Sequence, residues 1–143
     1  MKIQAAVTHK KGEPFKIETV DLAEPKAEEM LVRIVACGVC HTDESAQMEQ
    51  VPTALPAVLG HEGAGIVEKV GEGVTEFQPG DRVGFSFSFC GHCHNCQTGK
   101  NASCEHFNDI NFGGILRNGT SRLSQNGQTL SMFFGQSAFA QYA

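Results

Sequence analysis

Four cysteines in one short stretch constrain this chain more than any other feature. They are Cys90, Cys93, Cys96 and Cys104, with the spacing C-x2-C-x2-C-x7-C. Four thiolates can close a tetrahedral Zn²⁺ shell, and x2 spacing lets a single tight turn bring several sulfurs to one point. The alternatives are an iron–sulfur cluster and two disulfides. A bacterial ferredoxin run ends with x3 and a proline, whereas here the last gap is seven residues and Glu105 follows. We therefore expect a structural zinc site.

Composition limits the partners and the cellular compartments that are compatible with this site. The chain has 143 residues, enough for one domain with its own core, and a net charge of −5 with scattered Lys and Arg. The absence of a basic block argues against nucleic acid as a partner, and no apolar run approaches the roughly 20 residues of a membrane helix. The first residues do not have the apolar stretch of a signal peptide. We expect a cytoplasmic, reducing location, where clustered cysteines favour metal over disulfides.

Short apolar runs bounded by turns predict a mainly β fold. Thr42 is expected to N-cap a short helix over 43–50, and residues 107–128 are expected to be irregular. No alternation of strands and long helices is present, so the chain does not encode a parallel nucleotide-binding sheet. The predicted strands cover residues 2–8, 15–20, 31–37, 66–70 and 82–87, with strand-like pieces at 132–134 and 139–143.

Two further segments carry metal-ligating residue types. CGVCHTD spans 37–43, and GHEGAGIVEKVGEGV spans 60–74. The second segment fits G-H-E-x2-G-x5-G-x2-V and resembles the signature of zinc-containing medium-chain alcohol dehydrogenases. The CGVCHTD stretch, the PGDRV turn at 79–83 and the four-cysteine lobe match the same family in the same order. The tail FFGQSAFAQYA, 133–143, is similar to the aryl- or benzyl-alcohol dehydrogenase branch.

The resemblance implies a GroES-like, partly open β-barrel with short helices and a zinc-binding lobe at 90–104. Residues 1–143 would be the N-terminal catalytic domain, truncated, without a Rossmann nucleotide-binding domain, since no G-x-G-x-x-G follows a strand. The full-length enzyme would oxidise primary alcohols, aromatic ones included, to aldehydes with NAD(P). The fragment alone would be inactive because the third catalytic-zinc ligand of the family is a cysteine further downstream.

Several site residues follow from the resemblance. Cys40 and His61 match two ligands of the catalytic zinc, and Glu62 matches a carboxylate near the metal. Asp43 matches the group that holds the ligand histidine through its other ring nitrogen. Thr42 matches the hydroxyl that takes the alcohol proton.

Two more positions are assigned, His41 by the same likeness and Phe87 by its place in an alternating pattern. His41 matches a position that contacts the cofactor pyrophosphate, although an ordinary surface histidine is the alternative. Phe85, Phe87 and Phe89 alternate before the cysteine lobe, and their rings would either pack in the core or line a substrate pocket. Phe87 is the residue we expect to line the pocket.

The sequence also allows other interpretations of some of these residues and of the function of the whole chain. Cys37-x2-Cys40 also fits a redox dithiol, although no thioredoxin-like pattern surrounds it. His92 and His94 lie within the lobe and are expected to be exposed, since four cysteines already complete a tetrahedron. The expected partners are small alcohols and aldehydes, and the full-length form would be a homo-oligomer. The alternative function is a stand-alone zinc-binding GroES-like interaction module.

Overall fold

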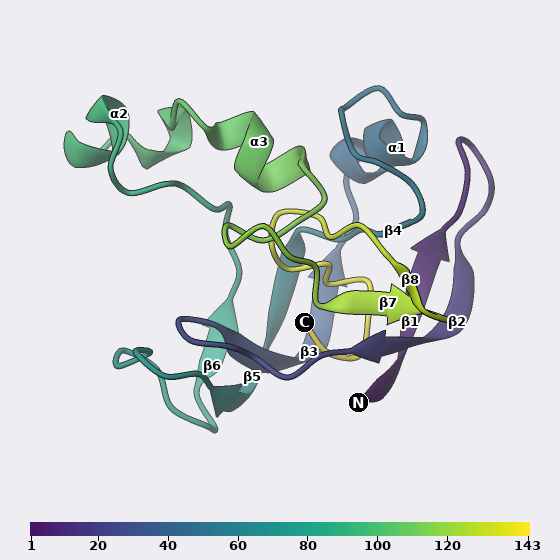
Figure 1. Cartoon of the computed structure of the whole chain (residues 1–143), viewed down its shortest axis with the longest axis horizontal. Helices are drawn as coiled ribbons and strands as arrows, with labels where there is room; N and C mark the ends of the chain where they lie inside the picture. Colours follow the sequence, from purple (N-terminus) through teal and green to yellow (C-terminus); the bar gives the residue numbers. More distant parts are fainter.

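The computed structural model describes all residues, 1–143. It is built mainly of short strands, and its helices are few and brief (Figure 1). The elements in chain order are β1 (Lys2–Thr8), β2 (Lys16–Leu22), β3 (Met30–Gly38), α1 (His41–Gln47), β4 (Ala57–Val58), β5 (Glu62–Val70), β6 (Arg82–Gly84), α2 (His94–Gln97), the 3-10 turn Asn101–Ser103, α3 (Phe107–Phe112), β7 (Leu123–Gln125) and β8 (Gln128–Thr129). No helix in the chain is both long and apolar enough to cross a membrane.

The strands form two antiparallel sheets, ordered β4-β1-β2-β7-β8 and β3-β5-β6. Side chains alternate along β1, where Ile3, Ala5 and Val7 are buried while Lys2 and Gln4 face solvent. This alternation is the pattern of a strand with one face on the core. The main core cluster lies between the sheets, and its largest members include Ile3, Val7, Val20, Leu22, Leu31, Leu123, Leu130 and Met132.

The last five residues join the two sheets. On one side, the N–H of Ala6 donates to the carbonyl of Phe139, and the N–H of Gln141 donates to the carbonyl of Gln4. On the other side, the N–H groups of Val32 and Ile34 donate to the carbonyls of Ala143 and Gln141. Because this extended segment pairs with β1 and β3 together, the sheets curl into a partly open barrel (Figure 1). The prediction of a mainly β fold is confirmed.

Residues 90–112 form a lobe that projects from the barrel and carries α2 and α3 (Figure 1). Its interior is unusual, because the buried cluster consists of the four cysteines, with only Phe107 and Ile110 packed against it. A cluster this small buries little apolar surface. The stability of the folded lobe therefore depends on the ion that its sulfurs bind.

Four local predictions were wrong. The strand-like piece predicted at 132–134 forms no strand, since the nearest pairing is an isolated bridge between Ala57 and Ser131. The helix begins at His41 and ends at Gln47, not over 43–50, because Cys40 is the N-cap residue in place of Thr42. The strand predicted over 82–87 ends at Gly84, although the N–H of Phe85 still donates to the carbonyl of Gly63 in β5. Residues 107–128 are irregular only in part, since α3 and most of the β7–β8 hairpin lie within them.

The hairpin carries a recognisable turn. Asn126 and Gly127 both have positive φ, 50° and 81°, which is the signature of a two-residue Asn-Gly turn.

Candidate metal centres

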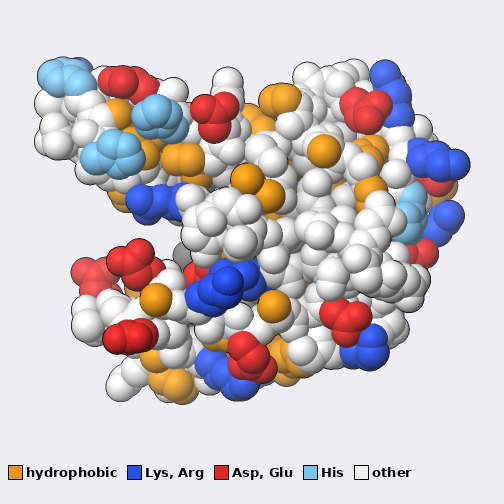
Figure 2. Space-filling view, viewed as in Figure 1, with side chains coloured by type: hydrophobic (Ala, Val, Ile, Leu, Met, Phe, Trp, Pro, Cys, Tyr) orange, Lys and Arg blue, Asp and Glu red, His pale blue; other side chains and the backbone are white.

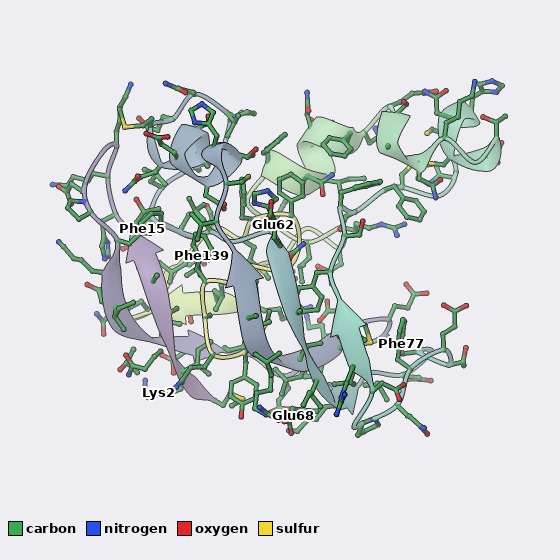
Figure 3. All side chains as sticks on the ribbon, turned by 180° about the vertical axis from the view of Figure 1, so that it is seen from behind. Lys2, Phe15, Glu62, Glu68, Phe77 and Phe139 are labelled. Atoms are coloured by element: carbon green, nitrogen blue, oxygen red, sulfur yellow. The ribbon has the colours of Figure 1, made fainter.

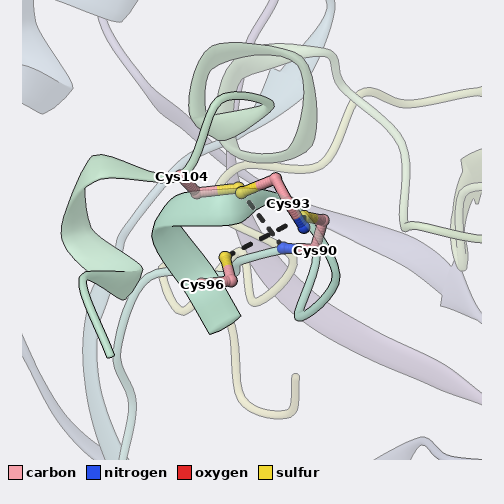
Figure 4. Close-up of side chains that lie close together, drawn as sticks. All are labelled: Cys90, Cys93, Cys96 and Cys104. Atoms are coloured by element: carbon pink, nitrogen blue, oxygen red, sulfur yellow. Dashed lines mark hydrogen bonds between the residues drawn. The ribbon is translucent and has the colours of Figure 1, made fainter. Parts of the chain in front are cut away.

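The four lobe cysteines converge on one point (Figure 4). Their sulfurs all lie within 4.8 Å of one another, all four residues are buried, and none is in a disulfide. The Sγ atoms of Cys90 and Cys96 are 3.9 Å apart. A tetrahedral zinc with Zn–S bonds of about 2.3 Å has S–S edges of about 3.8 Å. The sulfur arrangement therefore fits a closed tetrahedral zinc site.

Backbone groups prepare these sulfurs to carry charge. The N–H of Cys93 donates to the Cys90 sulfur at 3.3 Å, and the N–H of Cys90 donates to the Cys104 sulfur at 3.4 Å. The N–H groups of Glu105 and Cys96 lower the pKa of the Cys93 thiol to about 6, whereas burial raises the pKa of the Cys96 thiol to about 12. The Cys93 thiolate thus forms readily, whereas a charged Cys96 sulfur needs a cation beside it.

A second cluster joins the start of α1 to the start of β5. The Cys40 sulfur lies 3.3 Å from Nε2 of His61, and this nitrogen lies 4.0 Å from a carboxylate oxygen of Glu62. A tetrahedral zinc would set its sulfur and nitrogen ligands about 3.6 Å apart, so the first pair fits one ion. Cys40 and His61 are half-buried, and Glu62 is exposed at its end of β5 (Figure 3). This arrangement leaves one side open.

The beginning of α1 holds Cys40 in place. Cys40 has an extended backbone, and its sulfur accepts the N–H of Thr42 at 3.4 Å. Asp43 returns the interaction by accepting the N–H of Cys40 at 3.1 Å, which completes a capping box. Helix capping therefore fixes the thiol, and Thr42 is the second residue of α1, two residues after Cys40.

Asp43 also orients His61. Its carboxylate, 1% exposed, accepts Nδ1–H of His61 and the backbone N–H of Gly60, both at 3.1 Å. Because the carboxylate only accepts, Nδ1 carries the proton and Nε2 keeps its lone pair toward Cys40. This is the partnership expected for a histidine that binds a metal ion.

Two phenylalanines missing from the predicted site hold the other faces of His61. The Phe134 ring stacks on the imidazole with centroids 4.8 Å apart, and the Phe133 ring meets it edge-on at 5.4 Å. Phe134 has φ of 54°, a conformation that is rare for a bulky residue. The turn is fixed because the N–H of Phe133 donates to Ser137 Oγ and the N–H of Gly63 donates to Gln136. The only sequence signal for this loop was its match to a family tail.

The remaining two predicted residues lie apart from this cluster. His41 is exposed and pairs with Glu44 at 3.0 Å. Phe87 lines a groove of about 830 Å³, whose walls include Phe134 but none of the ligand candidates Cys40, His61 or Glu62. Its ring packs 5.6 Å from that of Phe107. Figure 2 shows a hollow between the lobe and the end of the barrel that carries β5 and β6.

Comparison with known proteins places this geometry in a family. Residues 26–143 match the alcohol dehydrogenase GroES-like domain. The chain belongs to this family. The expected resemblance to zinc alcohol dehydrogenases and the GroES-like fold are thereby confirmed.

The relatives are close in sequence and structure. Geraniol dehydrogenase of Castellaniella defragrans is 48% identical over 142 residues, which cover 98% of this chain and 38% of that protein. Class-3 alcohol dehydrogenase of Drosophila melanogaster is 46% identical over 141 residues, which cover 97% of this chain and 37% of that protein.

Among solved structures, benzyl alcohol dehydrogenase of Acinetobacter calcoaceticus has a TM-score of 0.93 at 44% identity, covering 100% of this chain and 38% of that one. An alcohol dehydrogenase zinc-binding domain protein of Burkholderia ambifaria has a TM-score of 0.96 at 45% identity, covering 100% and 39%. The chain thus spans less than two fifths of the length of these relatives.

Proposed function

We propose that this GroES-like domain is the metal-binding portion of a zinc-dependent, NAD(P)-using alcohol dehydrogenase. In a longer polypeptide it would act in the oxidation of primary alcohols, aromatic ones among them, to aldehydes, and residues 1–143 alone would be inactive. The observation that carries the proposal is the half-open group of Cys40, His61 and Glu62, with Asp43 behind His61. A catalytic zinc keeps a position for substrate, which the closed four-cysteine site cannot offer.

The residues of the open cluster have separate tasks. A zinc ion bound there would supply Lewis-acid polarisation of the alcohol oxygen. Asp43 fixes the tautomer of His61, so that Nε2 and the Cys40 sulfur point to one place. Glu62 offers a carboxylate beside them.

The proton of the alcohol needs an acceptor beside the cluster. Thr42 follows Cys40 by two residues, and no hydrogen bond within the chain occupies its hydroxyl. We assign Thr42 a relay role, in which its hydroxyl accepts the alcohol proton and passes its own proton to water. Further transfer to solvent cannot use a histidine three residues on, because Ser45 stands there.

The groove beside the cluster is assigned to the substrate's carbon skeleton. Phe87 lines it, and Phe134 both borders it and stacks on His61, so one residue connects the apolar wall with the open cluster. An aromatic or unsaturated alcohol would pack against these rings. The names of the geraniol and benzyl alcohol dehydrogenases support this substrate class.

The nicotinamide cofactor and the oligomer contacts are assigned to other parts of the longer protein. His41 is available to a cofactor phosphate, because its side chain is 82% exposed and its only partner is Glu44. An imidazolium or imidazole N–H can donate to a phosphate oxygen.

Turnover by the full-length polypeptide tests the proposal. With benzyl alcohol and NAD or NADP, Cys40→Ser and His61→Ala should each lower kcat by about a thousandfold, a loss of roughly 4 kcal/mol of transition-state stabilisation. The readout is absorbance of the reduced nicotinamide. Cys37→Ser is the control, because this half-buried thiol belongs to neither cluster, and the variant should keep near wild-type turnover.

The coding sequence beyond Ala143 separates the two candidate functions. A nucleotide-binding domain there supports the dehydrogenase, whereas a stop codon together with stable metal binding favours a stand-alone zinc-binding interaction module. Oxidation of benzyl alcohol by residues 1–143 alone would contradict the division of labour proposed above.

A further inference from the structure

A third group of ligating side chains lies on the lobe. Cys90, His92 and His106 place one ligating atom each within 4.8 Å of one another. The two imidazole rings are exposed, with centroids 5.9 Å apart, while Cys90 is 5% exposed. Figure 2 shows histidine side chains gathered on the outer end of this lobe. Cys90 is therefore shared between a buried cluster of four sulfurs and a surface pair of histidines.

The two histidines are free to bind an ion. Nδ1 of His92 lies 3.0 Å from the carbonyl oxygen of Cys90, which can only accept, so Nδ1 carries the proton and Nε2 keeps a lone pair. His106 makes no hydrogen bond through its ring within the chain.

The other histidines with side-chain partners are engaged differently. His9, His41 and His61 each face a carboxylate, at 2.8, 3.0 and 3.1 Å. A carboxylate partner holds a ring in place or favours its charged form, whereas neither histidine of the lobe pair faces a carboxylate.

The burial of the four-cysteine site suggests a role for His92 and His106, because an ion must pass the surface of the lobe to reach the sulfurs. All four sulfur residues are buried, so an ion from solvent must first lose water at the edge of the cluster. Imidazole nitrogens bind divalent ions of the zinc group readily and are weaker competitors than four thiolates. Because Cys90 belongs to both groups, an ion held at the surface already touches one of its final ligands.

We propose that His92, His106 and Cys90 form an entry site that captures a divalent transition-metal ion and passes it to the four-cysteine site. The proposal rests on that site being a metal site, as assigned above. The Cys90 thiol releases its proton to solvent when the ion is captured. In the transfer the ion keeps its 2+ charge and its bond to the Cys90 thiolate. Two neutral imidazoles leave, the thiolates of Cys93, Cys96 and Cys104 replace them, and any proton that these sulfurs still hold goes to solvent.

Cobalt loading of the metal-free chain tests this transfer, since the thiolate-to-cobalt absorption reports how many sulfurs bind. In stopped-flow mixing with Co²⁺, the wild type should show an early species with weak sulfur absorption, which then converts to the four-thiolate spectrum. The double variant His92→Ala/His106→Ala should lose the early species and load about tenfold more slowly, because capture no longer raises the local ion concentration. Its final spectrum should equal that of the wild type.

His94→Ala is the matched control, since His94 is exposed on α2 in the same lobe but outside the cluster. It should load at the wild-type rate. Loading of the double variant at the wild-type rate would overturn the proposal, as would equal slowing by His94→Ala. A changed final spectrum in the double variant would make the histidines permanent ligands and also overturn it. A wild type with no four-thiolate spectrum would instead refute the underlying metal site.

Discussion

The two cysteine-containing clusters differ in how the chain assembles them. The lobe site takes four ligands from residues 90–104, and all of them are buried around one point. The open site takes Cys40 and His61 from two elements 21 residues apart, and its third group, Glu62, faces solvent. One cluster is local and closed, whereas the other is made by the tertiary fold and keeps an open side. Closure suits a structural ion, and an open side suits chemistry.

The supports of the two clusters differ as well. The lobe has almost no apolar core of its own beyond Phe107 and Ile110. The open site rests on the barrel, because Asp43 ties His61 to α1 and Phe133 is fully buried behind it. The lobe should therefore need its ion to fold, while the open site should keep its shape without one.

The largest expected effect comes from removing one lobe ligand. Cys104→Ser should abolish chelator-resistant metal binding and expose the lobe to protease, because a structural zinc contributes on the order of 10 kcal/mol to local folding. Metal analysis after dialysis against chelator and limited proteolysis provide the measurements. Cys37→Ser is the control and should retain both properties. A Cys104→Ser chain that still holds its ion would mean that the lobe is not a four-thiolate site.

A buried ion pair in the barrel gives the next largest effect and should leave both metal sites intact. Arg122 donates two hydrogen bonds of 2.7 Å to Glu29, and both side chains are largely buried. Glu29→Gln leaves the guanidinium without its counter-charge and should cost about 3 kcal/mol in urea unfolding at neutral pH. Metal content should not change, and a loss of lobe metal would show that the barrel and lobe unfold together.

The same pair predicts a pH dependence. The hydrogen bonds from Arg122 hold the pKa of Glu29 below its ordinary value of 4.5. A folded pKa below the unfolded one gives stability that is present above pH 4.5 and is lost as pH falls through the folded pKa. Glu29→Gln should flatten that part of the stability profile. Glu24→Gln, which removes an exposed pair with Lys69, should leave the profile nearly unchanged.

Asp43→Asn tests whether the fold holds the open site. The amide cannot accept all three N–H groups that the carboxylate accepts, so stability should fall by about 2 kcal/mol. Cobalt affinity at the open site should fall about 10- to 100-fold, whereas the lobe spectrum should persist. Asp21→Asn, in an exposed pair with Lys2, should change stability by less than about 1 kcal/mol. If Asp43→Asn left the cobalt affinity of the open site unchanged, the assigned role of Asp43 in positioning His61 would be wrong.

Phe134→Leu should have the smallest effect. It removes the ring stacked on His61 and should cost about 1 kcal/mol, with a drop of a few fold in open-site cobalt affinity. Phe134→Gly relieves the positive φ and so separates backbone strain from the loss of stacking. The exposed Phe77→Leu is the control. Equal loss of metal at the lobe would contradict the independence of the two clusters.

The local cluster was largely predictable from sequence, and the distant one only through resemblance. The spacing of the cysteines from Cys90 to Cys104 restricts their geometry directly, because short gaps keep the sulfurs close together. Nothing in the spacing of Cys40 and His61 brings them together, since that depends on α1 lying against the start of β5.

The missed features share a physical cause. Cys40 caps α1 through a sulfur, and capping preferences point to Thr42 instead. Phe134 reaches His61 from the far end of the chain through a positive φ that no propensity favours. The hairpin at Asn126-Gly127 was a readable turn signal that the polar composition around it obscured. Long-range pairing, as in the tail that joins both sheets, lies outside local pattern reasoning.

Metal equivalents measured during a graded chelator challenge test the contrast between the clusters most directly. The metal-loaded chain should give up one ion to a weak chelator and retain one against a stronger chelator. His61→Ala should lose only the first ion, and Cys104→Ser only the second. Two equally resistant ions, or a single ion whose loss follows His61→Ala, would contradict the assignment of a closed structural site and an open catalytic one.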